Sequence, residues 1–223
     1  MIYIVTGTSS GLGYEIARLL SRDNSVIGIS RTLGDAVNIK NETFNFVEIN
    51  LASEKADIVT LLKRCVRPLL KNEYYTIVLN AGIFHAGDDR PSFEIDQKLM
   101  DVNYLAQKLI VQELDSENLR RILIVNSISV LVCHRDQHEY CASKHALQGY
   151  AKSLIRSARD KPYDVMVINP GGIKTPLWNH WPNDNVDDFL DCKMLADLIL
   201  YMLKIPHSVY IENLTILPSI DIH

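Results

Sequence analysis

Several specialised protein classes are excluded by what this sequence lacks. The 223 residues contain no apolar run near the roughly 18 residues that a membrane span requires, and no lysine- or arginine-rich run that would attract nucleic acid. The net charge of −4 gives no general attraction for polyanions or anionic membranes. The amino terminus leads directly into the apolar stretch 2–5, without the basic segment or cleavage site of a signal peptide. We therefore expect a cytoplasmic protein with no nucleic-acid partner and no membrane association.

Cysteine is scarce and scattered. The four cysteines are Cys65, Cys133, Cys141 and Cys192. Their spacing shows no disulfide framework, which favours a reducing compartment. His134 and His138 lie between Cys133 and Cys141, and all of these residue types can bind zinc, but the spacing matches no familiar zinc motif. We therefore expect no metal site.

Short apolar runs alternate with longer amphipathic segments along the chain. The apolar runs predict strands at residues 2–6, 25–30, 44–49, 75–79, 122–125, 164–168 and 208–217. Helical periodicity begins near Leu12 and recurs at residues 56–70, 93–114, 140–158 and 193–203. Such alternation is typical of parallel sheets connected by right-handed crossovers. We therefore expect an α/β fold: a doubly wound, mostly parallel seven-stranded sheet with helices on both faces, in one domain spanning residues 1–223.

A glycine-rich turn joins the first strand to the first helix, in the stretch Thr6-Gly7-Thr8-Ser9-Ser10-Gly11-Leu12-Gly13. Glycines at such a turn let backbone N–H groups approach a pyrophosphate at the positive end of the helix. The spacing differs from G-x-G-x-x-G, because three residues separate the first two glycines and one residue precedes the third. A turn that binds nothing is the alternative, but the strand before it and the helix after it favour a dinucleotide site.

The second strand is followed by Ser30-Arg31-Thr32. A protein that selects NAD usually carries Asp or Glu here, for the ribose 2′-hydroxyl. An arginine beside small hydroxyl residues instead suits a 2′-phosphate, by a charge-assisted contact. We therefore expect NADP(H) as the cofactor, with NAD(H) as the alternative if Arg31 is only a solvated loop residue.

Tyr140 and Lys144 lie four residues apart, which places them on one face of the predicted helix. A phenol ionises near pH 10 and is a poor base at neutral pH, but a nearby ammonium favours the phenolate. The pair therefore predicts an acid/base catalyst, although helices also carry this spacing by chance.

These segments occur in the order that one enzyme family shows. Its motifs are matched by Thr6-Gly7-x-x-x-Gly11-x-Gly13, Asn80-Ala81-Gly82, Asn103, Ser127, Tyr140-x-x-x-Lys144 and Pro170-Gly171. The chain therefore resembles the short-chain dehydrogenase/reductase family, in its compact single-domain branch, over nearly its whole length. The resemblance implies a Rossmann-type NAD(P)-binding catalytic domain.

The resemblance implies four catalytic residues. Tyr140 would exchange a proton with the substrate oxygen, and Lys144 would hold the nicotinamide ribose and lower the tyrosine pKa. Ser127 would hydrogen-bond the substrate oxygen, and Asn103 would stabilise a bent helix and anchor the water of a proton relay. Ser129 competes for the serine role, but the family spacing of thirteen residues before the tyrosine selects Ser127.

The resemblance also implies the residues that bind the cofactor. Asn80, Ala81 and Gly82 would let the cofactor cross the fourth strand, and Ile173 and Thr175 would bind the nicotinamide carboxamide. Asn50 stands where relatives commonly have an aspartate that contacts adenine, and its amide can still form hydrogen bonds there. With these, the expected set is Gly7, Ser9, Ser10, Gly11, Leu12, Gly13, Arg31, Asn50, Leu51, Asn80, Ala81, Gly82, Tyr140, Lys144, Pro170, Gly171, Ile173 and Thr175.

We therefore expect an NADP(H)-dependent oxidoreductase that interconverts a carbonyl and an alcohol on a small or medium substrate. A catalytically silent cofactor sensor or scaffold is the alternative, and an epimerase or dehydratase would need a substrate domain for which 223 residues leave no room. The family likeness implies a homodimer or homotetramer that pairs through the helices containing Asn103 and Tyr140. Substrate contacts are expected from the loops 83–91, 130–139 and 175–189, where Trp178 is either a lid anchor or a packed core residue.

Overall fold

The computed structural model describes residues 1–86, 92–133, 135–179, 186–209 and 211–219. Seven strands form one sheet in the order β3-β2-β1-β4-β5-β6-β7. They are β1 Ile2–Thr6, β2 Ser25–Ser30, β3 Phe44–Glu48, β4 Tyr75–Leu79, β5 Leu119–Val125, β6 Asp164–Pro170 and β7 Asn213–Ile216. Every neighbouring pair is parallel, including β6 with β7, so the sheet is all-parallel rather than mostly parallel. The predicted α/β fold is confirmed.

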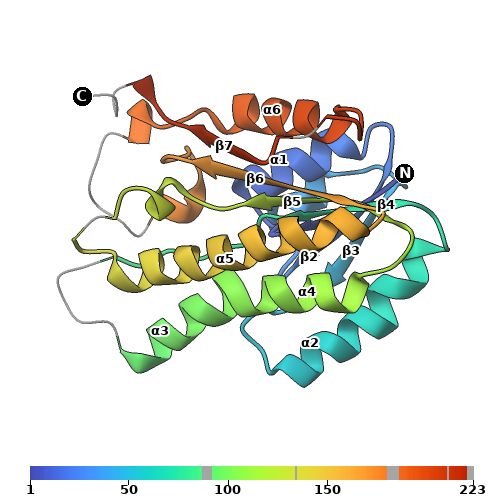
Figure 1. The fold of residues 1–223 in the computed structure, drawn as a ribbon, viewed down its shortest axis with the longest axis horizontal. Helices are drawn as coiled ribbons and strands as arrows, with labels where there is room; N and C mark the ends of the chain where they lie inside the picture. Colours follow the sequence, from blue (N-terminus) through green and yellow to red (C-terminus); the bar gives the residue numbers. More distant parts are fainter. Residues whose placement is uncertain (87–91, 134, 180–185, 210, 220–223) are drawn as a thin grey trace.

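Helices cover both faces of this sheet, as Figure 1 shows. The helices are α1 Gly11–Leu20, α2 Lys55–Leu61, α3 Phe93–Met100, α4 Ala106–Leu114, α5 His138–Ser157 and α6 Cys192–Lys204. Leu12 and Ile16 of α1 share one buried cluster with Leu195 and Ile199 of α6. The opposite face packs against α2, α4 and α5. No helix among the described residues is both long and apolar enough to cross a bilayer.

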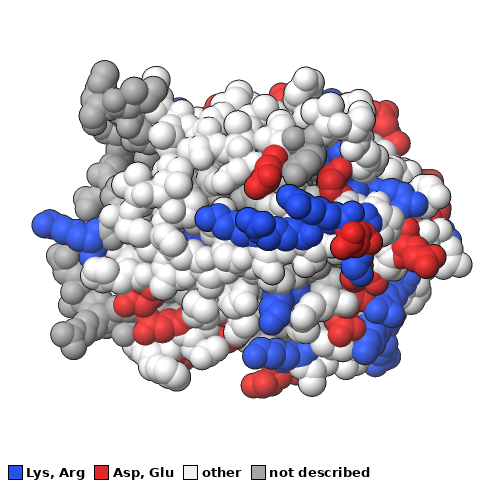
Figure 2. All heavy atoms as spheres, viewed as in Figure 1, with Lys and Arg blue, Asp and Glu red and all other residues white. Residues whose placement is uncertain are grey.

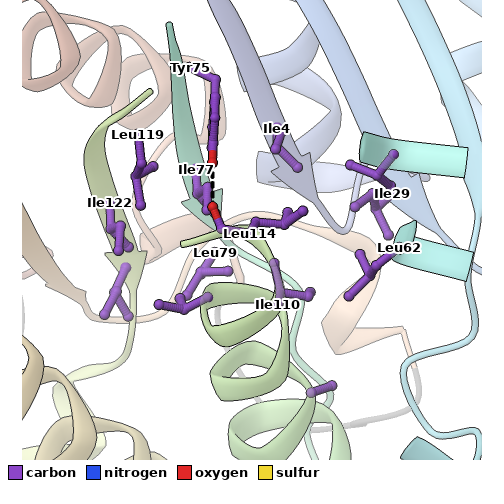
Figure 3. Packing of buried hydrophobic residues seen from close by; sticks show 14 of the residues in the cluster. Ile4, Ile29, Leu62, Tyr75, Ile77, Leu79, Ile110, Leu114, Leu119 and Ile122 are labelled. Carbon is purple, nitrogen blue, oxygen red and sulfur yellow. Dashed lines mark hydrogen bonds between the residues drawn. The ribbon is translucent and has the colours of Figure 1, made fainter. Parts of the chain in front are cut away.

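The core on the α4 side explains why the central strands form. β4 is buried along its whole length, because both of its faces are covered. Figure 3 shows Ile77 of β4 and Ile122 of β5 near Ile110 and Leu114 of α4. Each such fully buried aliphatic side chain contributes about 1.5–3 kcal/mol relative to exposure. The Tyr75 hydroxyl donates to the Leu114 carbonyl, which ties β4 to the end of α4.

The predicted helix 93–114 is continuous but contains a π-helical turn at residues 101–105, between α3 and α4. The buried side chain of Gln107 donates to the Val102 carbonyl (3.1 Å), which gives this carbonyl a partner inside the widened turn. The last strand was predicted at 208–217 but begins only at Asn213, because residues 206–209 form a turn in which Val209 N donates to Pro206 O. Tyr210 lies outside the described residues.

Charged side chains of both signs share the face drawn in Figure 2. Lysine and arginine gather in a band across its centre and right, with aspartate and glutamate interspersed. This face therefore presents a mixed charge rather than a large field of one sign.

Candidate active site

A cavity of about 770 Å³ opens at the carboxyl ends of the strands, where the strand order reverses between β1 and β4. This switch point is where open parallel sheets bind ligands. Nearly all of the predicted residues line the cavity: Gly7, Ser9, Ser10, Gly11, Leu12, Gly13, Arg31, Asn50, Leu51, Asn80, Ala81, Gly82, Ser127, Tyr140, Lys144, Pro170, Gly171, Ile173 and Thr175. Asn103 does not line it.

The glycine turn lies at one end of the cavity and is packed too closely for other residues. Gly7 has φ +78°, in the left-handed region that side chains disfavour. A Cβ on Gly13 would lie 2.1 Å from the Gly7 carbonyl oxygen, which no real contact allows. Ser10 begins α1 in an extended conformation, and its side chain makes no capping hydrogen bond. The first N–H groups of α1 are therefore left without a side-chain cap, the arrangement of an anion site.

Arg31 lies on the cavity wall beyond the end of β2 and is exposed. Within the described residues it forms no hydrogen bond or ion pair, so its guanidinium donors remain available. Asn50 lies farther along the wall; its Oδ1 accepts a hydrogen bond from Ala52 N (3.1 Å), and its amide donors have no partner in the described part of the chain. This end of the cavity therefore offers a cation and amide donors.

The ends of β1 and β4 are tied together beneath the cavity. Thr6 Oγ1 accepts hydrogen bonds from the backbone N–H groups of Asn80 and Ala81, each at 2.9 Å. Asn80 Nδ2 donates to Thr6 O (3.0 Å), and Gln107 Nε2 donates to Ala81 O (3.0 Å). Gln107 was not predicted from the sequence. Its position, one helical turn after Asn103, is the signal that could have identified it.

Asn103 is fully buried behind the cavity and fixes the segment that follows β4. Its Oδ1 accepts from Ile83 N (2.8 Å), while Nδ2 donates to Ile83 O (3.0 Å) and to Ser143 Oγ (2.9 Å). The side chain therefore links the π-helical turn, the β4 loop and α5. These contacts position the backbone around the cavity, and the role of Asn103 in a proton relay stays a prediction.

Tyr140 and Lys144 project into the cavity from the first two turns of α5. Burial raises the pKa of Tyr140 to about 12, although a hydrogen bond with Ser127 opposes that rise. Burial lowers the pKa of Lys144 to about 8. Lys144 Nζ lies 5.7 Å from the centre of the Tyr140 ring. Desolvation is the largest cause of the raised phenol pKa, and the role of Lys144 in lowering it stays a prediction.

Ser127, rather than Ser129, is the serine that meets Tyr140. Ser127 Oγ donates to Ser129 Oγ (3.1 Å) and accepts from Ser129 N (3.1 Å). Its neighbour Asn126 was not predicted. Asn126 Nδ2 donates to Gln148 Oε1 (2.9 Å) and to the Lys144 carbonyl (3.3 Å), which braces α5 against the end of β5.

Aromatic rings line the cavity beside Tyr140. Phe84 lies against Tyr140 in a T-shaped contact, with ring centres 4.8 Å apart. Trp178 lies 4.9 Å from Phe84 and 4.9 Å from Phe189. Phe84 and Phe189 were not singled out from the sequence, because each belongs to an irregular loop without periodicity.

Among the described residues, no three histidine, cysteine, aspartate or glutamate side chains gather to hold a metal ion. His134, the remaining member of the cysteine–histidine group noted in the sequence, lies outside those residues.

The chain is similar to known proteins in sequence. Residues 1–186 match the family described as short chain dehydrogenase. The chain belongs to this family. This short-chain dehydrogenase is 30% identical over 183 residues to the 3-oxoacyl-[acyl-carrier-protein] reductase FabG of Buchnera aphidicola, covering 78% of this chain and 74% of the relative. It is 26% identical over 193 residues to the rat Dehydrogenase/reductase SDR family member 7B, covering 79% of this chain but only 59% of that longer relative.

Its fold also recurs among solved structures. The alcohol dehydrogenase of the archaeon Thermococcus sibiricus, complexed with 5-hydroxy-NADP, superimposes with a TM-score of 0.84 at 19% identity, covering 98% of this chain and 96% of that one. Membership in the family makes this short-chain dehydrogenase an oxidoreductase that acts with NAD(P).

Proposed function

We propose that this short-chain dehydrogenase uses NADP(H) to interconvert a carbonyl compound and an alcohol, with Tyr140 as the group that exchanges the proton. The supporting observation is one continuous cavity that runs from the glycine turn, past Arg31, to the Tyr140 hydroxyl. Ser127 and Lys144 line the same end as that hydroxyl. A dinucleotide and a small substrate would therefore meet beside an acid/base pair.

The chain's residues fit a dinucleotide from end to end. The uncapped start of α1 and the close-packed glycines suit a pyrophosphate. The unpaired guanidinium of Arg31 suits a 2′-phosphate, which favours NADP(H) over NAD(H). The Lys144 ammonium has no hydrogen-bond partner in the described part of the chain, and it would hold the ribose beside the nicotinamide.

In the reducing direction the bound nicotinamide supplies a hydride to the carbonyl carbon. The Tyr140 hydroxyl then gives its proton to the carbonyl oxygen, so that carbonyl, hydride and proton together yield the alcohol. Ser127 would hydrogen-bond the same oxygen as negative charge develops on it. With a pKa near 12, Tyr140 holds this proton at neutral pH, as a proton donor must.

A substitution at Tyr140 tests this assignment. A panel of aldehydes, ketones and alcohols, followed by NADPH absorbance, identifies a substrate for the wild-type protein. Tyr140→Phe should then lower kcat by at least roughly a hundredfold, the scale of lost acid catalysis, while NADPH affinity changes little. Tyr201→Phe is the matched control, because Tyr201 is exposed on α6 and does not line the cavity.

Two outcomes would contradict the proposal. Undiminished turnover by Tyr140→Phe would remove the proton-transfer role. Tight NADPH binding without turnover of any compound in the panel would favour a catalytically silent sensor of the same fold.

We also infer a homodimer or homotetramer, as the family resemblance implies, with the outer sides of α4 and α5 as the contact. Tyr104, in the π-helical turn before α4, and Tyr150 of α5 form a ring pair, with centres 6.2 Å apart. Light scattering should give a multiple of the 25.3 kDa chain mass. A monomer at micromolar concentration would contradict this assembly.

A further inference from the structure

A row of aromatic rings leads away from the Tyr140 hydroxyl along the cavity. Phe84, Trp178 and Phe189 come from three separate segments, after β4, after β6 and before α6, yet each ring lies within 4.9 Å of the next. All three line the cavity and are half-buried, so part of each ring faces the open space. Phe84 continues this row to Tyr140 itself.

The rings are fixed in place by their surroundings. The indole N–H of Trp178 donates to the Ile173 carbonyl (2.9 Å), so the ring has no polar group left for the cavity. Phe189 lies on Gly172, where a Cβ would come within 2.8–2.9 Å of three ring atoms. The three rings therefore present apolar surfaces in a defined orientation, so they lose little conformational entropy when a ligand binds.

The segments that carry the rings add little charge to the cavity. Among the described residues of 83–84, 127–137 and 172–189 that line it, the carboxylate of Asp136 is the one charged group. The lysines of the lining, Lys98 and Lys144, come from α3 and α5, and Lys144 is the residue proposed to hold the ribose. Ile128 and Leu177 add further apolar surface.

We propose that Phe84, Trp178 and Phe189 determine the substrate, which is a neutral aldehyde or ketone bearing an aromatic ring. This inference rests on the proposed function and names its substrate class. The substrate ring packs against Phe84 and Trp178, while its carbonyl oxygen reaches Tyr140 and Ser127. Aromatic pairs favour such edge-to-face and offset contacts. An anionic keto acid is disfavoured by the carboxylate of Asp136, which lies on the same part of the lining.

Two aldehydes and one keto acid test the substrate class with the wild-type protein. Benzaldehyde, propanal and phenylglyoxylate carry, respectively, a neutral ring, no ring, and a ring with a carboxylate. We expect kcat/KM with NADPH to be highest for benzaldehyde, by about tenfold or more over each of the others, the scale on which apolar pockets discriminate. Equal or better turnover of propanal or phenylglyoxylate would overturn the inference.

Variants test whether the three aromatic rings are responsible for the substrate preference. Trp178→Leu and Phe84→Leu should each lower kcat/KM for benzaldehyde about tenfold more than they lower it for propanal. Phe84→Leu leaves the hydrogen bond between Trp178 and Ile173 in place, so it separates ring packing from any effect on Ile173. Tyr201→Leu, on the exposed face of α6, is the control. Equal losses for benzaldehyde and propanal would assign these rings to stability rather than to substrate choice.

A binding measurement keeps this test separate from catalysis. The chain has two tryptophans, Trp178 and Trp181, so Trp181→Phe leaves Trp178 as the single indole fluorophore. Benzyl alcohol added with NADPH should change that fluorescence in a saturable way, and cyclohexanecarboxylate should not. If the wild-type protein reduces no compound but benzyl alcohol still changes the fluorescence of Trp181→Phe, the proposed function fails and the aromatic site stands. If the wild-type protein reduces propanal but benzyl alcohol does not change that fluorescence, the aromatic site fails and the proposed function stands.

Discussion

Lys144 is buried at a cost to the folded state. Lys144 is only 4% exposed, and its ammonium has no hydrogen-bond partner within the described residues. Burial lowers its pKa from 10.5 to about 8. Between these two pH values the unfolded chain binds a proton that the folded chain releases, so stability rises with pH in this window. Below pH 8 the full penalty applies, roughly 3 kcal/mol.

We predict that Lys144→Met stabilises the protein while abolishing turnover. At pH 7 the variant should unfold with about 1–3 kcal/mol more free energy than the wild-type protein, because an apolar side chain of similar length removes the desolvation penalty. The gain should shrink as the pH rises from 8 to 10. Urea unfolding at several pH values measures both effects.

Lys152→Met on the exposed side of α5 is the control, and it should change stability by less than about 0.5 kcal/mol. A Lys144→Met variant less stable than the wild-type protein at pH 7 would show that the ammonium is well satisfied, and would contradict the lowered pKa.

Residues of this site differ in how far the sequence reveals them. The glycines, Tyr140 and Lys144 could be predicted because their chemistry depends on local spacing along one turn or one helix. Gln107 and Asn126 were not predicted, since their partners, Ala81 and Gln148, become neighbours only after folding. The loops 83–91 and 175–189 were expected to contact substrate, but the packing of Phe84, Trp178 and Phe189 against one another could not be predicted for the same reason.

At the scale of elements, Arg121 joins two strands to the last helix. Its Nε and Nη2 donate to the two carboxylate oxygens of Asp164 at the start of β6 (2.6 and 2.8 Å). Its Nη1 donates to the carbonyls of Met202, Leu203 and Ile205, which close α6. The carboxyl end of α6 carries partial negative charge, which favours the positively charged guanidinium of Arg121. Each of its hydrogen bonds replaces a bond to water that the buried side chain has lost.

We predict that Arg121→Met destabilises the protein by about 3–5 kcal/mol, because it removes the donor to the α6 carbonyls and leaves the Asp164 carboxylate with His207 alone among the described side chains. Denaturant unfolding measures the change. Arg120→Met, whose guanidinium lies half-exposed over the Tyr74 ring, should cost about 1 kcal/mol or less. Activity of folded Arg121→Met should persist at low temperature, since the network lies at the end of β5 away from the cavity. An Arg121→Met variant as stable as the wild-type protein would contradict this role.

Strands were predicted more accurately than the interruptions in helices. A buried parallel strand is a continuous apolar run, and β1, β2 and β4 coincide with the predicted ranges. The π-helical turn at 101–105 follows instead from side chains such as Gln107 that bond to distant backbone groups. No local periodicity records such contacts.

At the scale of the whole molecule, the cavity couples cofactor binding to folding. Its lining draws on segments from Gly7 to Phe189, so a ligand that fills it contacts the folded chain and not the unfolded one. A ligand present at 100 times its dissociation constant then adds about 2.7 kcal/mol of stability. For a chain of this size each kcal/mol corresponds to about 2–4 °C in Tm.

We predict that NADPH raises Tm more than NADH does at equal concentration, and that Arg31→Ala removes the difference. The loss of a hydrogen bond to a charged phosphate, about 1.5–3 kcal/mol, corresponds to roughly 10–100-fold in NADPH affinity. Thermal unfolding with each cofactor measures this, and Arg22→Ala, outside the cavity lining, is the control. An unchanged preference in Arg31→Ala would move the assignment to NAD(H).

The pairing of β1 with β4 has a consequence for how the chain folds during its synthesis. Ile2 pairs with Tyr75, so the edge of the cavity between the glycine turn and Asn80 does not exist until at least that much chain has been synthesised. Non-local parallel pairing of this kind closes slowly. A nascent chain that ends before β4 therefore carries the glycine turn but not the complete cavity. If the turn binds a nucleotide as proposed, retention of the nucleotide would report that β1 and β4 have paired.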